Sequence, residues 1–159
     1  MSTVAQIRAA ILAKLQGVSG IGQVHDYERF AGNEKDFQTL YLDAATSRIN
    51  GWNFYRASTR EMDIGIGEVR RLHAWRFTGF RSLDDADATG KSFDDLAESI
   101  ATAFRADRTL GGLIDDNKDL SAAEGESGIQ IDGIEPVLFA GVLCHRAQLS
   151  LLTETTETI

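Results

Sequence analysis

The segment that most constrains how this chain can fold is residues 70–109, which predicts a strand, an acidic turn and a helix in succession. Side chains of a strand alternate between its two faces. In the strand RRLHAWRFTGF and the residue before it, one face therefore carries Val69, His73, Trp75 and Phe77. Such a strand has one face suited to a core, so we expect it to lie within a sheet.

The helix predicted after the polar turn DDADATGK has its N-cap at Ser92 and is stopped by Gly111 and Gly112. Its apolar residues recur at the spacing of a single helical face: Phe93, Leu96, Ala97, Ile100 and Phe104. A half-buried strand that leads into an amphipathic helix indicates a helix packed on a sheet.

Residues 52–66 predict one strand of a β-hairpin arm, with Gly65 and Gly67 at the bend. Apolar residues occupy alternate positions at both ends of this strand: Trp52, Phe54, Met62, Ile64 and Ile66. Arg56 and Arg60 interrupt the same phase, and burying them without partners would be costly. We therefore expect the arm to leave the core. The residues expected to form a subunit interface there are Trp52, Phe54, Arg56 and Arg60.

The N-terminal part of the chain predicts one further helix. Thr3 and Gln6 fit a capping box, and an amphipathic pattern then continues to Gly17 or Gly20. Residues 22–30 predict a short strand, whereas residues 34–47 fit a helix and a strand equally well.

The C-terminal part predicts an acidic loop over residues 110–128 and then strands. Pro136 limits the first of these strands to an edge or a break. A last strand is predicted over residues 137–153, with one face formed by Phe139, Leu143, Ala147, Leu149 and Leu151. The polar tail, residues 154–159, is expected to be loose.

Together these elements predict an α+β fold. We expect a mostly antiparallel sheet with a projecting β-hairpin, flanked by two main amphipathic helices, in a single domain of residues 1–159.

No arrangement of residues in the sequence indicates an enzyme. Cys144 and His145 are adjacent on a predicted strand, so their side chains point to opposite faces and cannot act as nucleophile and base. Cys144 fits a packing residue, and His145 fits a hydrogen-bonded core or interface histidine. No two histidines have metal-ligand spacing. We expect no catalytic residue, no cofactor and no metal.

Residues 115–126 (DDNKDLSAAEGE) partly match a calcium-binding EF-hand loop. Asp115, Asn117, Asp119 and Glu126 stand where such a loop has ligands. Leu120 stands where the loop needs glycine for its sharp turn, and no amphipathic helix follows. A solvated acidic loop is the expectation, and a small calcium- or ligand-binding cytoplasmic domain is the alternative from a different class.

The overall charge and apolar content exclude several roles. A net charge of −8 argues against wrapping nucleic acid, although DNA could pass an acidic wall without binding. The longest apolar run, residues 137–144, is too short to span a bilayer, and the N-terminus lacks the pattern of a signal peptide. A single cysteine fits a reducing cytoplasm.

Residues 104–112 (FRADRTLGG) and 142–153 (VLCHRAQLSLLT) carry a resemblance to a known family, within an order of elements that covers nearly the whole chain. The chain resembles the tail terminator (tail completion) proteins of long-tailed bacteriophages, in the class typified by the lambda terminator. This family offers no catalytic residues to carry over.

The resemblance implies a structural subunit of the virion, assembled in the bacterial host cytoplasm. Six copies would form a homo-oligomeric ring at the head-proximal end of the tail, where the ring caps the tail tube protein and ends tail elongation. The ring would present a joining surface to a head-side connector protein and let DNA pass through its lumen without specific binding. No membrane is involved. Another head–tail connector or minor tail protein of similar fold is the nearest alternative.

Overall fold

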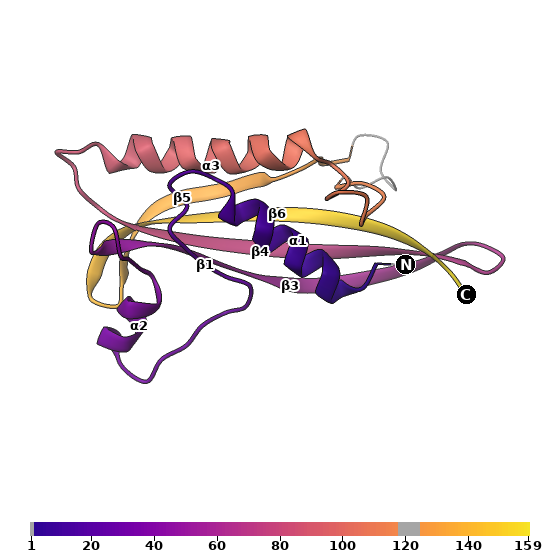
Figure 1. Cartoon of the computed structure of the whole chain (residues 1–159), viewed down its shortest axis with the longest axis horizontal. Helices are drawn as coiled ribbons and strands as arrows, with labels where there is room; N and C mark the ends of the chain where they lie inside the picture. Colours follow the sequence, from indigo (N-terminus) through magenta and orange to yellow (C-terminus); the bar gives the residue numbers. More distant parts are fainter. Residues whose placement is uncertain (1, 118–124) are drawn as a thin grey trace.

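The computed structural model describes residues 2–117 and 125–159 of the chain (Figure 1). Its helices are α1 (Val4–Gln16), α2 (Glu34–Leu40) and α3 (Thr89–Ala106). Its strands are β1 (Gln23–His25), β2 (Leu42–Asp43), β3 (Arg48–Gly65), β4 (Glu68–Ser82), β5 (Gln130–Phe139) and β6 (Val142–Thr158). The sheet has the order β1-β3-β4-β6-β5, with β2 paired to β3 outside this path. Among the strand pairs of the described residues, β1–β3 alone is parallel, so the predicted α+β fold with a mostly antiparallel sheet is confirmed.

The main core lies between one face of the sheet and the helices α1 and α3 (Figure 1). The predicted inward face of β4 is confirmed, because Trp75 and Phe77 are buried against this layer. The apolar stripe predicted for α3 is buried as well: Phe93, Leu96, Ala97, Ile100 and Phe104. The helix α1 begins at the predicted capping box of Thr3 and Gln6 and ends at Gly17. In the part of the chain that the structure describes, no helix combines the length and apolar character needed to cross a bilayer.

A glycine in β4 makes room for the largest side chain of this core. Gly79 lies directly opposite Trp52 of β3 in the antiparallel register. A Cβ atom at position 79 would lie 2.4 Å from the indole ring of Trp52, which is closer than atoms can pack. Because position 79 has no side chain, the indole lies over β4 and reaches Phe93 of α3, with ring centroids 5.7 Å apart.

A second, smaller core lies on the opposite face, at the end of the sheet near α2 (Figure 1). It is an aromatic cluster of Phe37, Tyr41, Phe80 and Phe139. The segment of residues 34–47, which the sequence left undecided, forms α2 and β2 in succession. Asn33 starts this helix, because its side chain accepts a hydrogen bond from the backbone N–H of Asp36.

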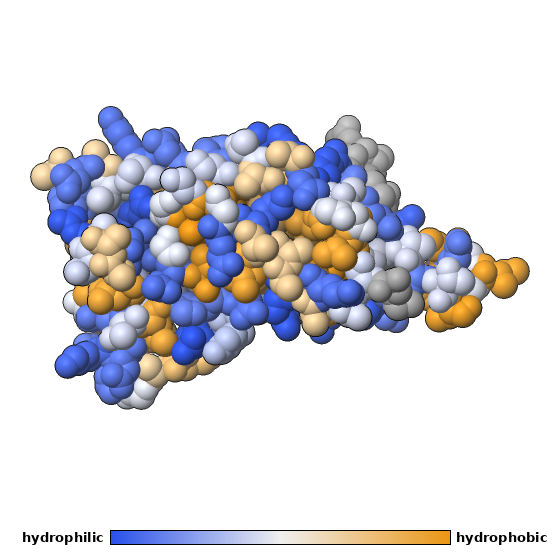
Figure 2. Space-filling model, in the orientation of Figure 1, coloured by the Kyte–Doolittle hydropathy of each residue, from blue (hydrophilic) through white to orange (hydrophobic). Residues whose placement is uncertain are grey.

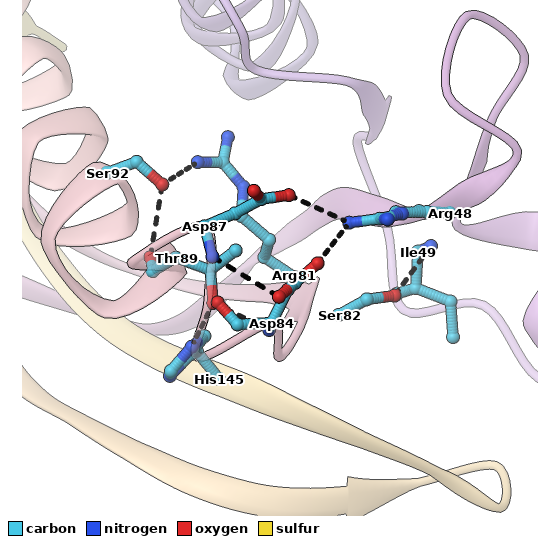
Figure 3. A network of polar contacts seen from close by, with 9 residues as sticks. All are labelled: Arg48, Ile49, Arg81, Ser82, Asp84, Asp87, Thr89, Ser92 and His145. Atoms are coloured by element: carbon cyan, nitrogen blue, oxygen red, sulfur yellow. Dashed lines mark hydrogen bonds and ion pairs between the residues drawn. The ribbon is translucent and has the colours of Figure 1, made fainter.

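The helix α3 begins four residues earlier than predicted, with its N-cap at Ala88 rather than at Ser92. The hydroxyl of Thr89 accepts a hydrogen bond from the backbone N–H of Asp84 and donates one to the backbone carbonyl of Asp84. These two bonds end the acidic turn at Thr89, so the helix starts there. Ser92 lies in the first turn, where it donates to the Thr89 carbonyl and accepts from Arg81 (Figure 3). The helix also ends earlier than predicted, with its C-cap at Asp107 rather than at Gly111 or Gly112.

The prediction of one last strand over residues 137–153 is wrong. The chain reverses at Ala140 and Gly141, which both have positive φ (47° and 79°), and so forms the β5–β6 hairpin. Phe139 consequently belongs to the aromatic cluster rather than to the face that carries Leu149. Pro136 lies within β5, which is an edge strand as predicted.

The prediction of a loose tail is also wrong, because residues 154–158 continue β6 alongside β4. Thr153 is fully buried and its hydroxyl accepts a hydrogen bond from Nε1 of Trp75 at 3.0 Å. Glu154 is buried and forms an ion pair with Arg70 at 2.8 Å. At the other end of the chain, the strand expected over residues 22–30 is only three residues long.

The hairpin of β3 and β4 turns at Ile66 and Gly67. Of the two glycines predicted at the bend, Gly67 lies in the turn, whereas Gly65 is the last residue of β3 and pairs with Glu68. The side-chain phase of the hairpin differs from the prediction. A bulge at residue 57 shifts the register, so that Arg56 pairs with Trp75 while Arg60 pairs with Leu72. Directly paired residues of an antiparallel sheet share a face. The two arginines therefore lie on opposite faces of the sheet, and the single phase expected for residues 52–66 is wrong.

We expect Phe104→Ala to lower the free energy of unfolding by about 3–5 kcal/mol, because this fully buried ring fills the space between α3 and the sheet. Chemical denaturation with the linear extrapolation measures the change. The control is Arg105→Ala on the exposed side of the same helix, for which we expect about 0.5 kcal/mol or less. Equal midpoints for the two variants would contradict the packing of α3.

Candidate interaction surfaces

Among residues 2–117 and 125–159, no three histidine, cysteine or acidic side chains are placed to hold a metal ion. Residues 118–124 of the predicted acidic loop lie outside the described residues. Immediately before these residues, Asn117 is buried and donates a hydrogen bond to the Phe104 carbonyl at 3.1 Å. Asp116 forms an ion pair with Arg108 at 2.8 Å. These contacts fix the described start of the loop to the end of α3.

Cys144 and His145 have the separate structural roles that the sequence predicts. The Cys144 side chain is buried in the aromatic cluster, and burial raises the pKa of its thiol to about 11. The thiol is therefore protonated at neutral pH and is a poor nucleophile. Nε2 of His145 hydrogen-bonds the hydroxyl of Thr89 at 2.8 Å and so links β6 to the start of α3 (Figure 3). Burial lowers the pKa of His145, and the Arg81 charge lowers it further.

His73 is the histidine whose protonation is most strongly opposed. Its side chain is buried on the core face of β4, and Nδ1 hydrogen-bonds the hydroxyl of Thr59 at 2.9 Å. Burial lowers the pKa of His73 to about 4, and the positive charges of Arg71 and Arg56 act in the same direction. Glu157 and Glu61 oppose this shift but do not cancel it. The imidazole is therefore neutral at physiological pH.

The most prominent surface feature is an arm that extends past the helices (Figure 1). We define the arm as residues 58–72 and 154–159. It has three strands rather than the two expected, because β6 pairs with β4 as far as the register Glu68↔Thr158. The backbone N–H of Ile159 also donates to the Gly67 carbonyl at 2.9 Å. The tail of the chain thus stiffens the hairpin.

Apolar side chains gather at the end of the arm (Figure 2). Ile66 is fully exposed, Ile159 is 86% exposed and Ile64 is 40% exposed. We call these three residues the apolar tip. Scattered exposed apolar residues are ordinary on a protein surface, whereas a cluster at the end of a projection indicates an interaction site.

The body of the arm is held by ion pairs on both of its faces. On one face, Arg71 lies 2.9 Å from a carboxylate oxygen of Glu61 and 3.5 Å from one of Glu157. On the other face, Arg70 pairs with the buried Glu154. These pairs link neighbouring strands of the arm and help to fix its shape where no helix covers it.

The structure separates the four residues predicted to form a subunit interface into two groups. Trp52 and Phe54 are fully buried in the main core, so the interface role predicted for them is not compatible with their position. The bulge at residue 57 is the physical reason, because the arm begins only after it. Arg56 and Arg60 are exposed, and neither forms an ion pair or hydrogen bond within the described part of the chain.

A groove lies at the opposite end of the sheet, between the segment of residues 28–41 and the sheet face. Its volume is about 330 Å³. We call it the aromatic groove, and its lining includes Phe30, Phe37, Tyr41, Phe80, Leu138 and Phe139. Phe30 is 78% exposed and Leu138 is 74% exposed. This groove is not predicted from the sequence, because the residue pattern places Phe30 in a strand and Phe139 on the other face of the sheet.

Between the arm and the aromatic groove, the same sheet face is open and polar. Arg76 and Gln148 are exposed on it, with Tyr55 and Ser150 partly exposed beside them. These residues line a shallow cavity of about 390 Å³. The alternation in β4 and β6 predicts this polar face, because Arg76, Gln148 and Ser150 lie in the phase opposite to the core residues.

Comparison with the models of known protein families gives no match, and comparison with curated proteins gives none either. What the chain does must therefore be argued from its own surfaces. The described residues combine an arm with an apolar tip and an aromatic groove at the other end. Arg60 within the arm and Arg56 just before it form no ion pair among these residues.

The free energy of unfolding should fall as the pH is lowered from 6.5 to about 4. An unfolded histidine takes up its proton near pH 6.5, whereas folded His73 resists protonation until about pH 4. The unfolded chain thus binds more protons within this window, and the stabilisation is complete above pH 6.5. We expect a loss of roughly 2–3 kcal/mol from this residue. Denaturation of wild type and His73→Gln between pH 7 and pH 4 measures it, and an equal pH dependence in both would contradict the assignment.

Millimolar calcium should leave the melting temperature where EDTA leaves it, because the 115–126 loop lacks the glycine that an EF-hand requires. A ligand that binds only the folded state raises the melting temperature by mass action. Thermal unfolding in calcium and in EDTA is the measurement, with Glu126→Gln as the control. A calcium-dependent rise of several degrees that disappears in Glu126→Gln would overturn this expectation.

Proposed function

We propose that this protein is a tail terminator subunit of a long-tailed bacteriophage. In this role it assembles into a closed ring of six copies on the last ring of the tail tube protein. The ring ends tail elongation and presents the surface to which a head-side connector protein binds. The subunit acts as a structural component of the virion, without catalysis.

The three-stranded arm is the observation that carries this proposal. Its three strands are hydrogen-bonded to one another, but its apolar tip has no partner within the described part of the chain. A projection of this kind contributes little burial to its own subunit and gains burial only against another molecule. A contact between different surfaces of identical subunits is heterologous, and it gives a ring when the rotation closes.

The charge of the chain fits a ring through which DNA passes. The net charge is −8, and the exposed residues include many carboxylates. Phosphate groups are repelled by such a surface, so a lumen lined by it would let the duplex slide without being held. Binding of DNA along a groove would instead require a basic stripe.

In this proposal, Arg56 and Arg60 fix how neighbouring subunits of the ring are aligned with each other. Both are exposed and form no ion pair with the described residues, so each can meet a carboxylate of a neighbour without losing an ion pair seen in the structure. Charged contacts at an interface mainly fix orientation and speed association. Because Arg60 lies in the arm and Arg56 lies just before it on the opposite face of the sheet, the two side chains test contacts on different faces of the sheet.

Reversing both charges (Arg56→Glu with Arg60→Glu) should leave the subunit folded but weaken ring assembly by about tenfold or more, equivalent to ~1.4 kcal/mol. Light scattering over a range of concentrations measures assembly, and wild type should reach six-fold the 17.4 kDa chain mass. In an infected host, the double variant should yield tails of irregular, excessive length that fail to join heads.

The matched control is Lys91→Glu with Arg105→Glu, which changes the net charge equally at two exposed positions of α3. This control should assemble and complement like wild type. The single variants Arg56→Glu and Arg60→Glu then show which face of the arm meets the neighbour. A double variant that forms rings and normal tails would refute the role of the arginines. A wild-type protein that stays monomeric and does not alter tail length would refute the proposed function.

A further inference from the structure

We propose that the apolar tip of one subunit inserts into the aromatic groove of the next subunit. This inference rests on the proposed function, because it names the two surfaces that meet where identical subunits associate. The occupant of the groove is thus a second copy of this chain.

The position of the two surfaces requires the contact to be intermolecular. The apolar tip lies at one end of the long axis of the molecule, and the groove beside α2 lies at the other end (Figure 1). The arm is a continuation of the central sheet, so it cannot fold back over the length of its own subunit. A tip can therefore reach only the groove of another copy.

The groove has the size and rigidity to accept the tip. Its volume of about 330 Å³ corresponds to roughly ten water molecules at ~30 Å³ each, which is ample for Ile64 and Ile66 together. Its floor is fixed by ring contacts, since Phe80 and Phe139 stack with their centroids 4.1 Å apart. The hydroxyl of Tyr41 is held by Asn53 at 2.8 Å. A preformed groove loses little conformational entropy when it is filled.

The charges around the two surfaces are complementary. Asp63 and Glu68 flank the turn of the arm, and neither forms an ion pair within the described residues. Arg29, Arg146 and Glu28 line the groove, so its lining carries one net positive charge. Arg146 already pairs with Glu135, whereas Arg29 contacts the ring of Tyr27 and Nδ1 of His25 but no carboxylate of the described residues. An acidic turn entering a groove bordered by arginines brings opposite charges together at the rim, where they favour this orientation.

A tip-to-groove contact is directional, because the two surfaces differ. Each subunit then has one tip to offer and one groove to fill, so every interface in an assembly is the same. A ring closes when the last tip enters the first groove, and no apolar tip is then left exposed. This geometry explains why a chain of this kind would keep two exposed apolar surfaces at opposite ends.

The test is cross-linking between single-cysteine positions in the full-length chain. Ile66→Cys places a thiol on the tip, and Leu138→Cys places one at the groove. Both positions are exposed, so both variants should fold, and the native Cys144 is buried and unreactive. The two variants are mixed and treated with a short bis-maleimide. We expect at least tenfold more cross-linked dimer than from a control mixture of Ile66→Cys with Ser99→Cys, which lies on the exposed side of α3.

The outcomes separate this inference from the proposed function. Equal yields for the two mixtures, with wild type forming an oligomer by light scattering, would overturn the tip-to-groove contact and leave the ring in place. Equal yields with a monomeric wild type would overturn both. A selective cross-link, together with association at least tenfold weaker for the Ile66→Ser variant than for wild type, would support the contact. Serine at position 66 removes the apolar side chain that the groove would bury and adds no charge that the arginines could bind.

Discussion

The structure depends on the long antiparallel ladder at the centre of the sheet, in which β4 hydrogen-bonds to β3 on one side and to β6 on the other. A strand paired on both sides has its backbone donors and acceptors satisfied without help from any helix. The ladder can therefore continue beyond the point where α1 and α3 stop covering it. The main core forms where the helices cover the ladder, and the arm is the part that they leave uncovered.

Much of the fold follows from local patterns, because alternation and helical periodicity are imposed by burial. The stripe of α3, the inward face of β4 and the capping box of α1 all reflect burial or a local hydrogen bond. The predictions fail where a single residue changes the face of the sheet on which the following side chains lie. The bulge at residue 57 moves Arg60 to the other face, and no residue type marks it in advance. The reversal at residues 140–141 carries only one glycine, so the apolar alternation in the sequence continues through it without a break.

The interaction surfaces were predictable to different degrees. The arm could be expected because two arginines interrupt the alternating apolar residues of the segment 52–66. The prediction that all of these side chains share one face of the sheet was wrong. The third strand of the arm could not be expected from the sequence. Its residues are mainly threonine and glutamate, which indicate an exposed segment, and they become buried only by pairing with β4, which is distant in the sequence. The aromatic groove joins side chains from α2, β4 and β5, which are distant in the sequence. Only the tertiary arrangement brings such residues together, so periodicity within one element gives no sign of them.

The outer edge of β3 has a consequence for the free subunit. Beyond Asn53 this edge pairs with no other strand in the described part of the chain, and a long unpaired edge is a template for fibrillar aggregation. The bulge at residue 57 breaks the regular row of donors and acceptors. Arg56, Arg60, Glu61 and Asp63 then place charges of both signs along it. These features disfavour the addition of strands from other chains to this edge. The exposed arm therefore does not make the subunit prone to fibrillar aggregation.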